Sequence, residues 1–442
     1  MDGDVSRTIL SLAVPTVIGL LSAAVFHLFD ALFVSKLGTD ASAAVGITFA
    51  VQTLLQALGY TFGTGGGSLL SRNLGRGKDH DAEQIASLAF LFSITIGALI
   101  TVVGLAFELP LLRLLGATEK SIPYAQRYWN VFLWSAPALC ANFTMSQLLR
   151  SEGRAMYAMW GLLIGNLLNI LLDPILIFNL DLGIVGAALA TVSCQWISFF
   201  IFLIIYWKNK TKISIFSKIK HPDFKKSGSL LIAGAPSLLR QGLVFLSTLL
   251  FNRTAAGLGE YAISAMSVVS RMFMLTFSIC AGIGQGMMSV VGYHYGAGNP
   301  EQVKKALRFA LLVSTVGMAA ISIPLLLLAP QIISLFRPEE EIISFGTPAL
   351  RWHMSVLALH GMITCAGMYL QATGSSLSAS LVAAARQGLF FLPLIVWIPW
   401  QFGIPAFRYV QPLADLFTFL LSIPLLWFSM RRLNINDRTP PR

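Results

Sequence analysis

Three acidic side chains stand deep inside long apolar stretches of this 442-residue chain: Asp30, Asp173 and Asp415. A carboxylate inside a membrane is costly, so such a residue usually faces the protein interior or water and often serves an ion pathway. The alternative for each is a hydrogen bond or an ion pair between helices. For Asp415 the structural interpretation is favoured, because the sequence around it supplies no polar side chains; it is favoured also for His353 and His360, which could titrate.

Asp173 has polar neighbours on one face of its predicted helix. Asn166, Asn169 and Asp173 are spaced i, i+3, i+7, so they project from the same side. Pro174 has no N–H and leaves the carbonyl of Ile170 without its helical partner. Carbonyl, amide and carboxylate oxygens are what a small hard cation such as Na⁺ requires, and the carboxylate could instead carry a proton. The segment therefore predicts a site for Na⁺ or H⁺.

Asp30 lies late in the first apolar segment, fifteen residues after Pro15 and one turn after His27. A proline kinks a helix and gives it a place to bend, so Pro15 and Pro174 are predicted hinges. If Asp30 and Asp173 share a cavity, a bound Na⁺ or proton would relieve the repulsion between them. That relief is a physical basis for coupling ion movement to a change of shape.

The elements that carry these residues are predicted to be membrane helices. The chain is 55% hydrophobic and 12% charged, with a mean hydropathy of +0.72. Apolar runs of about 20 residues or more, long enough to cross a bilayer, recur along it. We predict an all-α polytopic membrane protein with twelve transmembrane helices, at about 8–35, 41–71, 84–107, 122–149, 155–179, 183–207, 229–256, 262–292, 303–328, 345–371, 377–402 and 406–430.

The net charge of +11 is distributed as membrane topology requires. If the chain starts in the cytoplasm and alternates sides, the cytoplasmic segments hold 20 of the 31 basic residues. This positive-inside pattern predicts cytoplasmic termini in a plasma (inner) membrane, and a lipid bilayer rather than nucleic acid as the surroundings. The first apolar run is too long for a signal peptide and is interpreted as an uncleaved helix.

The sequence repeats itself at a shift of 221 positions. Pro15 then meets Pro236, and Gly153 meets Gly374, with Gly63 and Gly65 meeting Gly284 and Gly286. The repeat predicts two pseudo-symmetric six-helix lobes, residues 1–207 and 229–442, joined by a cytoplasmic linker at 208–228. Six helices return the chain to its starting side, so the lobes should be related by an axis along the membrane normal, with a cavity between them, as in transporters.

Motifs for an enzyme are absent from the sequence. There is no His-Glu-x-x-His zinc motif and no Walker pair, and the glycines of 63–67 lack the Gly-Lys-Ser/Thr ending of a phosphate loop. Small residues in such a run favour close helix packing instead. The cysteines are interpreted as small core residues: Cys140, Cys194, Cys280 and Cys365. We therefore expect no catalysis and no cofactor, with transport driven by an ion gradient.

Four segments together resemble one known family. They are Pro15 with Phe-Asp-Ala-Leu-Phe-Val at 29–34, Gly-Tyr-His-Tyr-Gly-Ala-Gly-Asn at 292–299, Asn169-x-x-x-Asp173-Pro174, and Arg386-Gln387 followed by Pro393. With the repeat, they are similar to the multidrug and toxic compound extrusion (MATE) transporters, in the bacterial DinF/MepA-like branch, over about 10–430. The resemblance implies a monomeric antiporter that exports cationic or amphipathic drugs in exchange for Na⁺ or H⁺.

The resemblance also implies a cation site in the first lobe. Its residues would be Asp30, Asn169, Asp173 and Thr191, with Asn166, His27 and Gln195 as secondary candidates. The NorM-like branch carries acids on helices seven and ten of the second lobe, and this chain has none there. At the 221-residue shift the four site positions meet Phe251, Phe390, Leu394 and Pro412. The ion site is therefore expected in the first lobe alone.

Two alternatives remain open. A flippase for lipid-linked sugars would keep the fold but carry anionic cargo, and Arg240, Arg271 and Arg386 on one cavity wall would favour it. A channel or a non-transporting sensor is a different class of protein. The two-lobe repeat argues against it, and passive, gradient-independent flux would argue for it.

Overall fold

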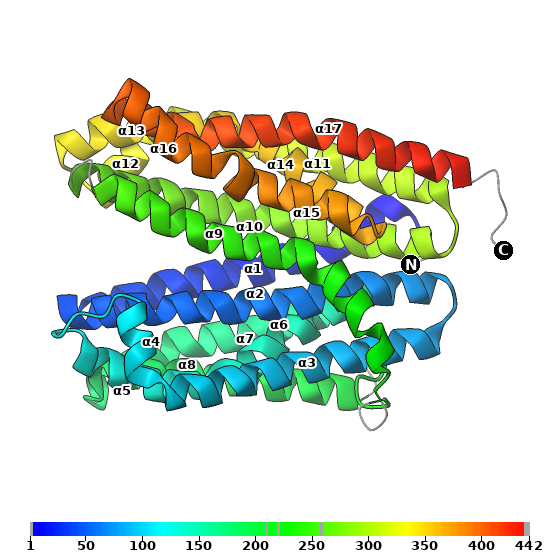
Figure 1. Ribbon diagram of the computed structural model, residues 1–442, viewed down its shortest axis with the longest axis horizontal. Coiled ribbons are helices and arrows are strands. Elements are labelled where there is room, and N and C mark those ends of the chain that lie inside the picture. The colour runs from blue at the N-terminus through cyan, green and yellow to red at the C-terminus, as the bar shows by residue number, and fades with distance from the viewer. Residues whose placement is uncertain (1–2, 209–210, 219–221, 257–259, 437–442) are drawn as a thin grey trace. The chain divides into compact units, whose positions relative to one another are not determined.

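The computed structural model describes residues 3–208, 211–218, 222–256 and 260–436, and every element among them is helical (Figure 1). The first repeat and the linker contain α1 (Val5–Ser35), α2 (Thr39–Gly75), α3 (Asp79–Ala106), α4 (Glu108–Leu114), α5 (Ile122–Phe132), η1 (Leu133–Ser135), α6 (Ala136–Ser151), α7 (Ala155–Pro174), η2 (Ile175–Asn179), α8 (Gly183–Trp207) and η3 (Phe224–Lys226). The second repeat contains α9 (Ser227–Ala256), α10 (Glu260–Gly296), α11 (Pro300–Leu327), α12 (Ala329–Phe336), α13 (Glu340–Ser355), α14 (Leu357–Ala372), α15 (Ser376–Ala384), η4 (Ala385–Leu389), α16 (Phe391–Phe402), η5 (Ile404–Tyr409) and α17 (Val410–Asn436).

The all-helical membrane fold is confirmed, but the count of twelve spans is not. Among the described residues ten helices are long and apolar enough to cross a bilayer, and an eleventh forms if α13 and α14, bent by 46°, count as one span. The stretch predicted at 122–149 is not one helix, since η1 separates α5 from α6.

The helices group into two compact units whose limits fall inside α1 and α9. One unit runs from Ile18 to Leu238, and the other joins the segment up to Val17 with the residues from Leu239 onward. We call them the first-repeat unit and the second-repeat unit. Each limit lies two residues after a proline, Pro15 or Pro236, and the two limits are 221 positions apart, like the repeat itself.

Each unit therefore contains the opening half of the other repeat's first helix. In the first-repeat unit, a Cβ on Gly65 would lie 2.8 Å from the backbone nitrogen of Gly234, and Thr64 donates to Ser237 at 2.8 Å. In the second-repeat unit, a Cβ on Gly286 would lie 2.9 Å from the nitrogen of Ala13. Glycine is required at both positions because backbones touch there, which confirms the packing interpretation of the glycine run.

The chain turns in the same way at equivalent helix ends. Gly77 and Gly298 have φ of 68° and 70°, and Gly153 and Gly374 have φ of 90° and 83°. Only glycine adopts such angles without strain, so each repeat keeps a glycine where a helix stops. The division of the chain at linker 208–228 stays a prediction. The packing shows in addition that α1 and α9 each contribute their first residues to the unit of the other repeat.

The described part of the linker packs on the first-repeat unit. Ile213 and Ile215 are buried in its core, and Lys226 Nζ lies 2.7 Å from Asp81 Oδ1. Glu152, in the turn between α6 and α7, accepts hydrogen bonds from the backbone N–H groups of Lys212 and Ile213. Burial raises the pKa of Glu152 to about 7, although these hydrogen bonds oppose the shift.

Candidate functional site

Asn169, Asp173 and Thr191 form one hydrogen-bonded group between α7 and α8. With its amide nitrogen turned toward Asp173, Asn169 donates to Asp173 Oδ2 at 3.0 Å and accepts from the backbone N–H of Thr191 at 3.2 Å. All three side chains are buried, with Asp173 fully inaccessible. The predicted face of α7 thus points at α8, and the fourth predicted site position, Thr191, lies where the resemblance implied.

Asp30 reaches this group from α1. Asn166, one turn before Asn169, donates to Ser22 Oγ at 3.0 Å and so ties α7 to α1. The carboxyl groups of Asp30 and Asp173 lie within electrostatic reach of each other. The structure therefore joins Asn169, Asp173 and Thr191 directly and places Asp30 within electrostatic reach of Asp173, while Asn166 fastens the helices that carry the two acids.

Three oxygens in this group lack a hydrogen-bond partner among the described residues. They are Asp30 Oδ1, Asp173 Oδ1 and Thr191 Oγ1, each buried. An unpaired buried carboxylate oxygen is unfavourable, so it should be satisfied by a proton or a cation. Two carboxylates with hydroxyl and amide oxygens are a suitable donor set for Na⁺, and either carboxylate could instead hold a proton.

The backbone changes helix type directly after Asp173. Pro174 ends α7, and a π-helical turn, Ile175–Asn179, follows. Such turns occur mostly as single bulges, frequently at functional sites, and they follow here from the missing N–H of proline. In α1, Pro15 lies inside a continuous helix, two residues before the boundary between the units. The hinge roles of Pro15 and Pro174 stay predictions.

Sequence reasoning missed Tyr128 of α5. Its side chain is 3% exposed, lies within electrostatic reach of both Asp30 and Asp173, and sits beside the Thr191 hydroxyl. A phenol at this point could donate to a carboxylate or shield it from water. The only signal in the sequence was a tyrosine within a predicted span, which also suits a position at the membrane interface.

The remaining secondary candidates have other neighbours. Gln195 accepts from Asn142 of α6 at 3.0 Å through its side chain and at 2.9 Å through its backbone carbonyl. The ring of His27 packs against Phe26 and Phe49, with centroids 4.6 and 5.9 Å away. Both residues support the helices around the site, and a direct role in ion binding stays a prediction.

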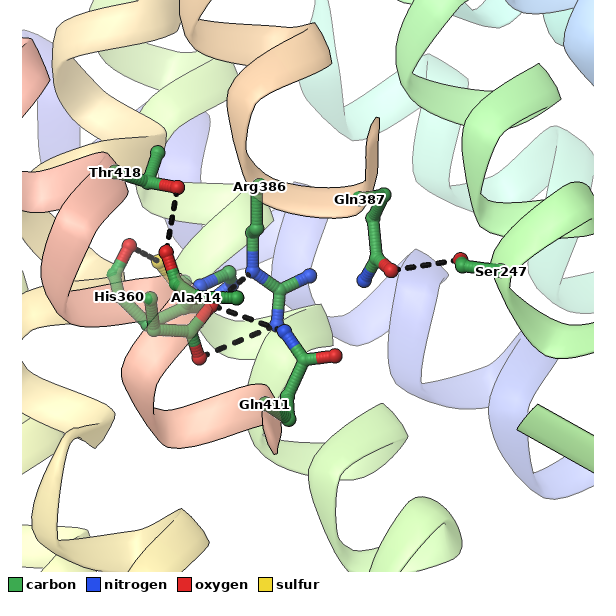
Figure 2. Close-up of polar contacts among 9 residues, drawn as sticks. Ser247, His360, Arg386, Gln387, Gln411, Ala414 and Thr418 are labelled. Atoms are coloured by element: carbon green, nitrogen blue, oxygen red, sulfur yellow. Dashed lines mark hydrogen bonds and ion pairs between the residues drawn. The ribbon is translucent and has the colours of Figure 1, made fainter. Parts of the chain in front are cut away.

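A second polar cluster lies in the second-repeat unit, where Arg386 of η4 points toward Gln411 of α17 (Figure 2). Arg386 Nε donates to Asp415 Oδ1 at 2.6 Å, and Gln411 Nε2 donates to the same oxygen at 3.1 Å. We expected no polar neighbours for Asp415, and that was wrong: Gln411 lies one turn earlier on the same helix, and Arg386 comes from η4, 29 positions away. The ion-pair alternative for Asp415 is the one that the structure shows.

The other intramembrane basic residues and histidines differ in their surroundings. Arg271 is exposed and Arg240 is half-buried, whereas Arg386 is largely buried in its ion pair with Asp415. His353 Nδ1 lies 3.0 Å from the Ala349 carbonyl, and His360 packs against Phe273 and Phe277. The three arginines do not act as one set, since the charge of Arg386 is already balanced. The four cysteines are free and buried, as expected of core residues.

Comparison with known proteins gives a consistent result. Residues 15–175 and 236–397 each match the family model described as MatE, and the two matches begin 221 positions apart. The multidrug export protein MepA of Staphylococcus aureus strain N315 is 26% identical over 433 residues, covering 98% of this chain and 96% of that protein. MepA of Staphylococcus haemolyticus is 26% identical over 438 residues, with the same coverage.

Solved structures agree over almost the whole chain. A MATE transporter in the straight conformation superposes with a TM-score of 0.92 at 26% identity, covering 98% of this chain and 97% of that one. A MOP superfamily transporter from Pyrococcus furiosus, described as having a binding pocket of reverse polarity, gives 0.90 at 27% identity, covering 99% and 98%. VcmN of Vibrio cholerae in the bent form gives 0.89 at 23% identity, covering 98% of each chain, and supports the fold alone.

Proposed function

The chain belongs to the MatE family, whose members are membrane transporters and not enzymes, and from this premise we propose that it is a secondary-active multidrug efflux antiporter. It exports cationic and amphipathic compounds in exchange for Na⁺ or H⁺. The relatives at 26% identity carry the description multidrug export protein, which supports the substrate class. Fourteen Met and thirty Phe supply adaptable apolar surface that suits promiscuous binding.

The observation that carries the ion-coupling proposal is the set of unpaired oxygens on Asp30, Asp173 and Thr191. In a buried site, two nearby carboxylates repel each other, and a bound cation or proton removes both the repulsion and the unsatisfied oxygens. Binding of a cation or a proton therefore stabilises this buried site more than it would stabilise an exposed carboxylate. It can respond to an ion gradient across the membrane.

The transport cycle follows from that response. A cation from outside binds Asp30 and Asp173, neutralises the site and draws α1 toward α7. The residues of α1 up to Val17 belong to one unit and those from Ile18 belong to the other. A bend near Pro15 therefore changes the angle between these two segments of α1. The drug is released to the outside, and the cation then leaves to the cytoplasm. The cation and the drug must each bind the two conformational states of the transporter with different affinity, because a ligand that binds both states equally cannot drive the transport cycle.

The proposed setting is the plasma (inner) membrane, with both termini in the cytoplasm. The positive-inside distribution of Lys and Arg supports this orientation. In it, linker 208–228 and Glu152 face the cytoplasm, and no nucleic acid is expected as a partner. We propose that the transporter works as a monomer.

The flippase alternative loses its main support. It rested on Arg240, Arg271 and Arg386 lying on one cavity wall, and Arg386 is paired with Asp415 at 2.6 Å, which weakens its attraction for an anionic head group. Export of a lipid-linked sugar would have to depend on Arg240 and Arg271. Drug efflux needs no such cluster.

The test is efflux of a cationic dye from proteoliposomes with Na⁺ and H⁺ gradients imposed separately. D30N and D173N should reduce gradient-driven efflux to the level of protein-free vesicles while the protein remains folded. D181N is the matched control, because Asp181 is an exposed aspartate eight residues after Asp173, and it should pump normally. Normal coupling in both site variants would overturn the ion site, and equal flux without any gradient would favour a channel.

A further inference from the structure

A basic groove lies in the second-repeat unit, where α1 and α11 begin. Its volume is about 430 Å³, and it is lined by Ser6 of α1 and by residues of α11 between positions 301 and 312. The described residues that line it include three cations, Lys304, Lys305 and Arg308, and one acid, Glu301. The groove is therefore positively charged and suited to an anion.

The ion pairs at this groove are open to solvent. Lys304 Nζ lies 2.7 Å from Glu301 Oε1, and the Glu301 side chain is 81% exposed. Lys305 Nζ lies 2.9 Å from Asp4 Oδ1, and both of these side chains are more than half exposed. Exposed pairs contribute little to stability, so another anion can replace the carboxylates. Arg308 is exposed one turn further along α11, and its planar guanidinium can donate two hydrogen bonds to a phosphate.

An apolar stripe of α11 continues from the groove into the membrane. Leu312 and Val316 follow Arg308 at intervals of four residues, so the three side chains lie on one face of the helix. Leu312 is 63% exposed and Val316 is 58% exposed, on a helix that is long and apolar enough to cross a bilayer. Basic and apolar groups thus follow one another along α11 in the order in which a phospholipid presents its phosphate and its acyl chains.

The equivalent helix of the first repeat uses the same positions to bind the linker. At the 221-residue shift Lys304 and Lys305 meet Glu83 and Gln84 of α3. Glu83 accepts a hydrogen bond from a linker hydroxyl at 2.9 Å, and Gln84 accepts one from a linker backbone N–H at 3.2 Å. Hydrogen-bond acceptors of the first repeat are therefore replaced by cations in the second. The surface that binds the chain itself in one repeat is suited to an anion in the other.

We propose that this groove binds an anionic phospholipid of the cytoplasmic leaflet, with its phosphate on Lys305 and Arg308 and an acyl chain along Leu312. Basic pockets beside membrane helices on the cytoplasmic side bind such head groups. The positive-inside distribution accounts for cations on this side of the membrane, but not for their place in a groove above an exposed apolar stripe. The lipid site depends on the proposed orientation and is independent of the transported compound.

The experiment is native mass spectrometry of the purified protein in detergent. The protein is titrated with dioleoyl phosphatidylglycerol, which is anionic, and with dioleoyl phosphatidylcholine, which has the same chains and no net charge. Glycerol phosphate, added as a competitor, tests whether a free phosphate is sufficient. The test variant is K305Q/R308Q, and K305R/R308K keeps both charges. The matched control is R76Q/K78Q, which removes two exposed cations from the first repeat on the same side of the membrane.

In K305Q/R308Q the Kd of the first phosphatidylglycerol should rise about tenfold or more, while the Kd of phosphatidylcholine stays unchanged. K305R/R308K and R76Q/K78Q should bind both lipids as the natural protein does. Natural affinity for phosphatidylglycerol in K305Q/R308Q, or an equal loss in R76Q/K78Q, would overturn the groove as the binding place. Equal affinity of the natural protein for the two lipids, or displacement of the lipid by equimolar glycerol phosphate, would overturn the anionic lipid as its occupant.

Discussion

The same helix crossing holds different chemistry in the two repeats. In the first, the crossing of α7 and α8 is close: a Cβ on Gly165 would collide with Ser198 Oγ and lie 3.2 Å from the Cys194 carbonyl. At the 221-residue shift Gly165 meets Arg386 and Cys194 meets Asp415, and these two counterparts form the buried ion pair. Small residues bring one pair of helices together, and an ion pair joins the other.

The buried acids of the two repeats also differ in their hydrogen-bond partners. Asp30 and Asp173 each leave an oxygen unsatisfied, whereas Asp415 is held by Arg386 and Gln411. An unpaired buried acid has a strong reason to bind a proton or a cation, and a paired one does not. The comparison indicates how ion binding can be confined to one of two repeats that share a fold: a buried acid in one repeat is paired with an arginine, and the buried acids in the other are not.

The largest effect is expected when the first-repeat acid is replaced by the residue of its counterpart. D173L installs the leucine that Leu394 provides in the second repeat. Gradient-driven dye efflux should fall to background, because the ion loses a ligand. The melting temperature should not fall, since a buried charge is removed. If D173L still shows gradient-driven efflux, Asp173 is not required for coupling, and the proposed difference between the two repeats is wrong.

The next effect concerns the ion pair. R386Q alone leaves Asp415 buried and uncompensated and should destabilise the protein by about 3–5 kcal/mol, whereas R386Q/D415N should be close to the natural protein. Thermal unfolding in detergent measures both. If the single and double variants melt together, the pair does not act as a unit, and the contrast with the first repeat loses its basis.

A smaller effect is expected at the close crossing of the first repeat. G165A should destabilise by about 1–3 kcal/mol through its collision with Ser198. G165A/S198A should recover most of the loss, because the colliding hydroxyl is gone. G46A is the control: Gly46 lies in α2 with nothing within 4 Å of an added Cβ, so it should be neutral or slightly stabilising.

The smallest effect concerns pH at the cytoplasmic turns. Glu152 holds the linker, while the hydroxyl of its counterpart in the second repeat, Thr373, donates to the carbonyls of Tyr369 and Leu370 in the preceding turn of its own helix. The pKa of Glu152 is raised from 4.5 to about 7, so the folded protein keeps a proton that the unfolded chain has lost. Stability should therefore fall as pH rises from about 5 to 7.

In E152Q the pH-dependent contribution of this side chain to the free energy of unfolding should disappear. Between pH 5 and 7 the melting temperature should then fall less than in the natural protein, by a difference equivalent to about 1–2 kcal/mol. T373S, a conservative change at the counterpart, is the matched control and should follow the natural profile. Identical pH profiles for E152Q and the natural protein would show that Glu152 does not titrate in this range.

Much of the fold could be predicted because it depends on local composition and spacing. Apolar runs predict helices, and the i, i+3, i+7 spacing placed Asn166, Asn169 and Asp173 on one face, as observed. The break between α5 and α6 and the bend at α13–α14 were not predicted, because both runs are apolar enough on average to be taken as single spans. For the first of them the sequence does carry a signal, since Pro137 lies in the first turn of α6.

By itself, the sequence determined the all-helical membrane fold and the two repeats, and with the family resemblance it predicted the residues of the candidate first-repeat site. Periodicity and hydropathy act over a few turns of helix, and the repeat is visible as identity at a fixed shift. Only the tertiary structure decided which acids are paired. Arg386 reaches Asp415 across 29 positions, and Asn169 of α7 binds the backbone of Thr191 in α8. Contacts of that kind depend on how helices pack, and no spacing rule along one helix specifies them.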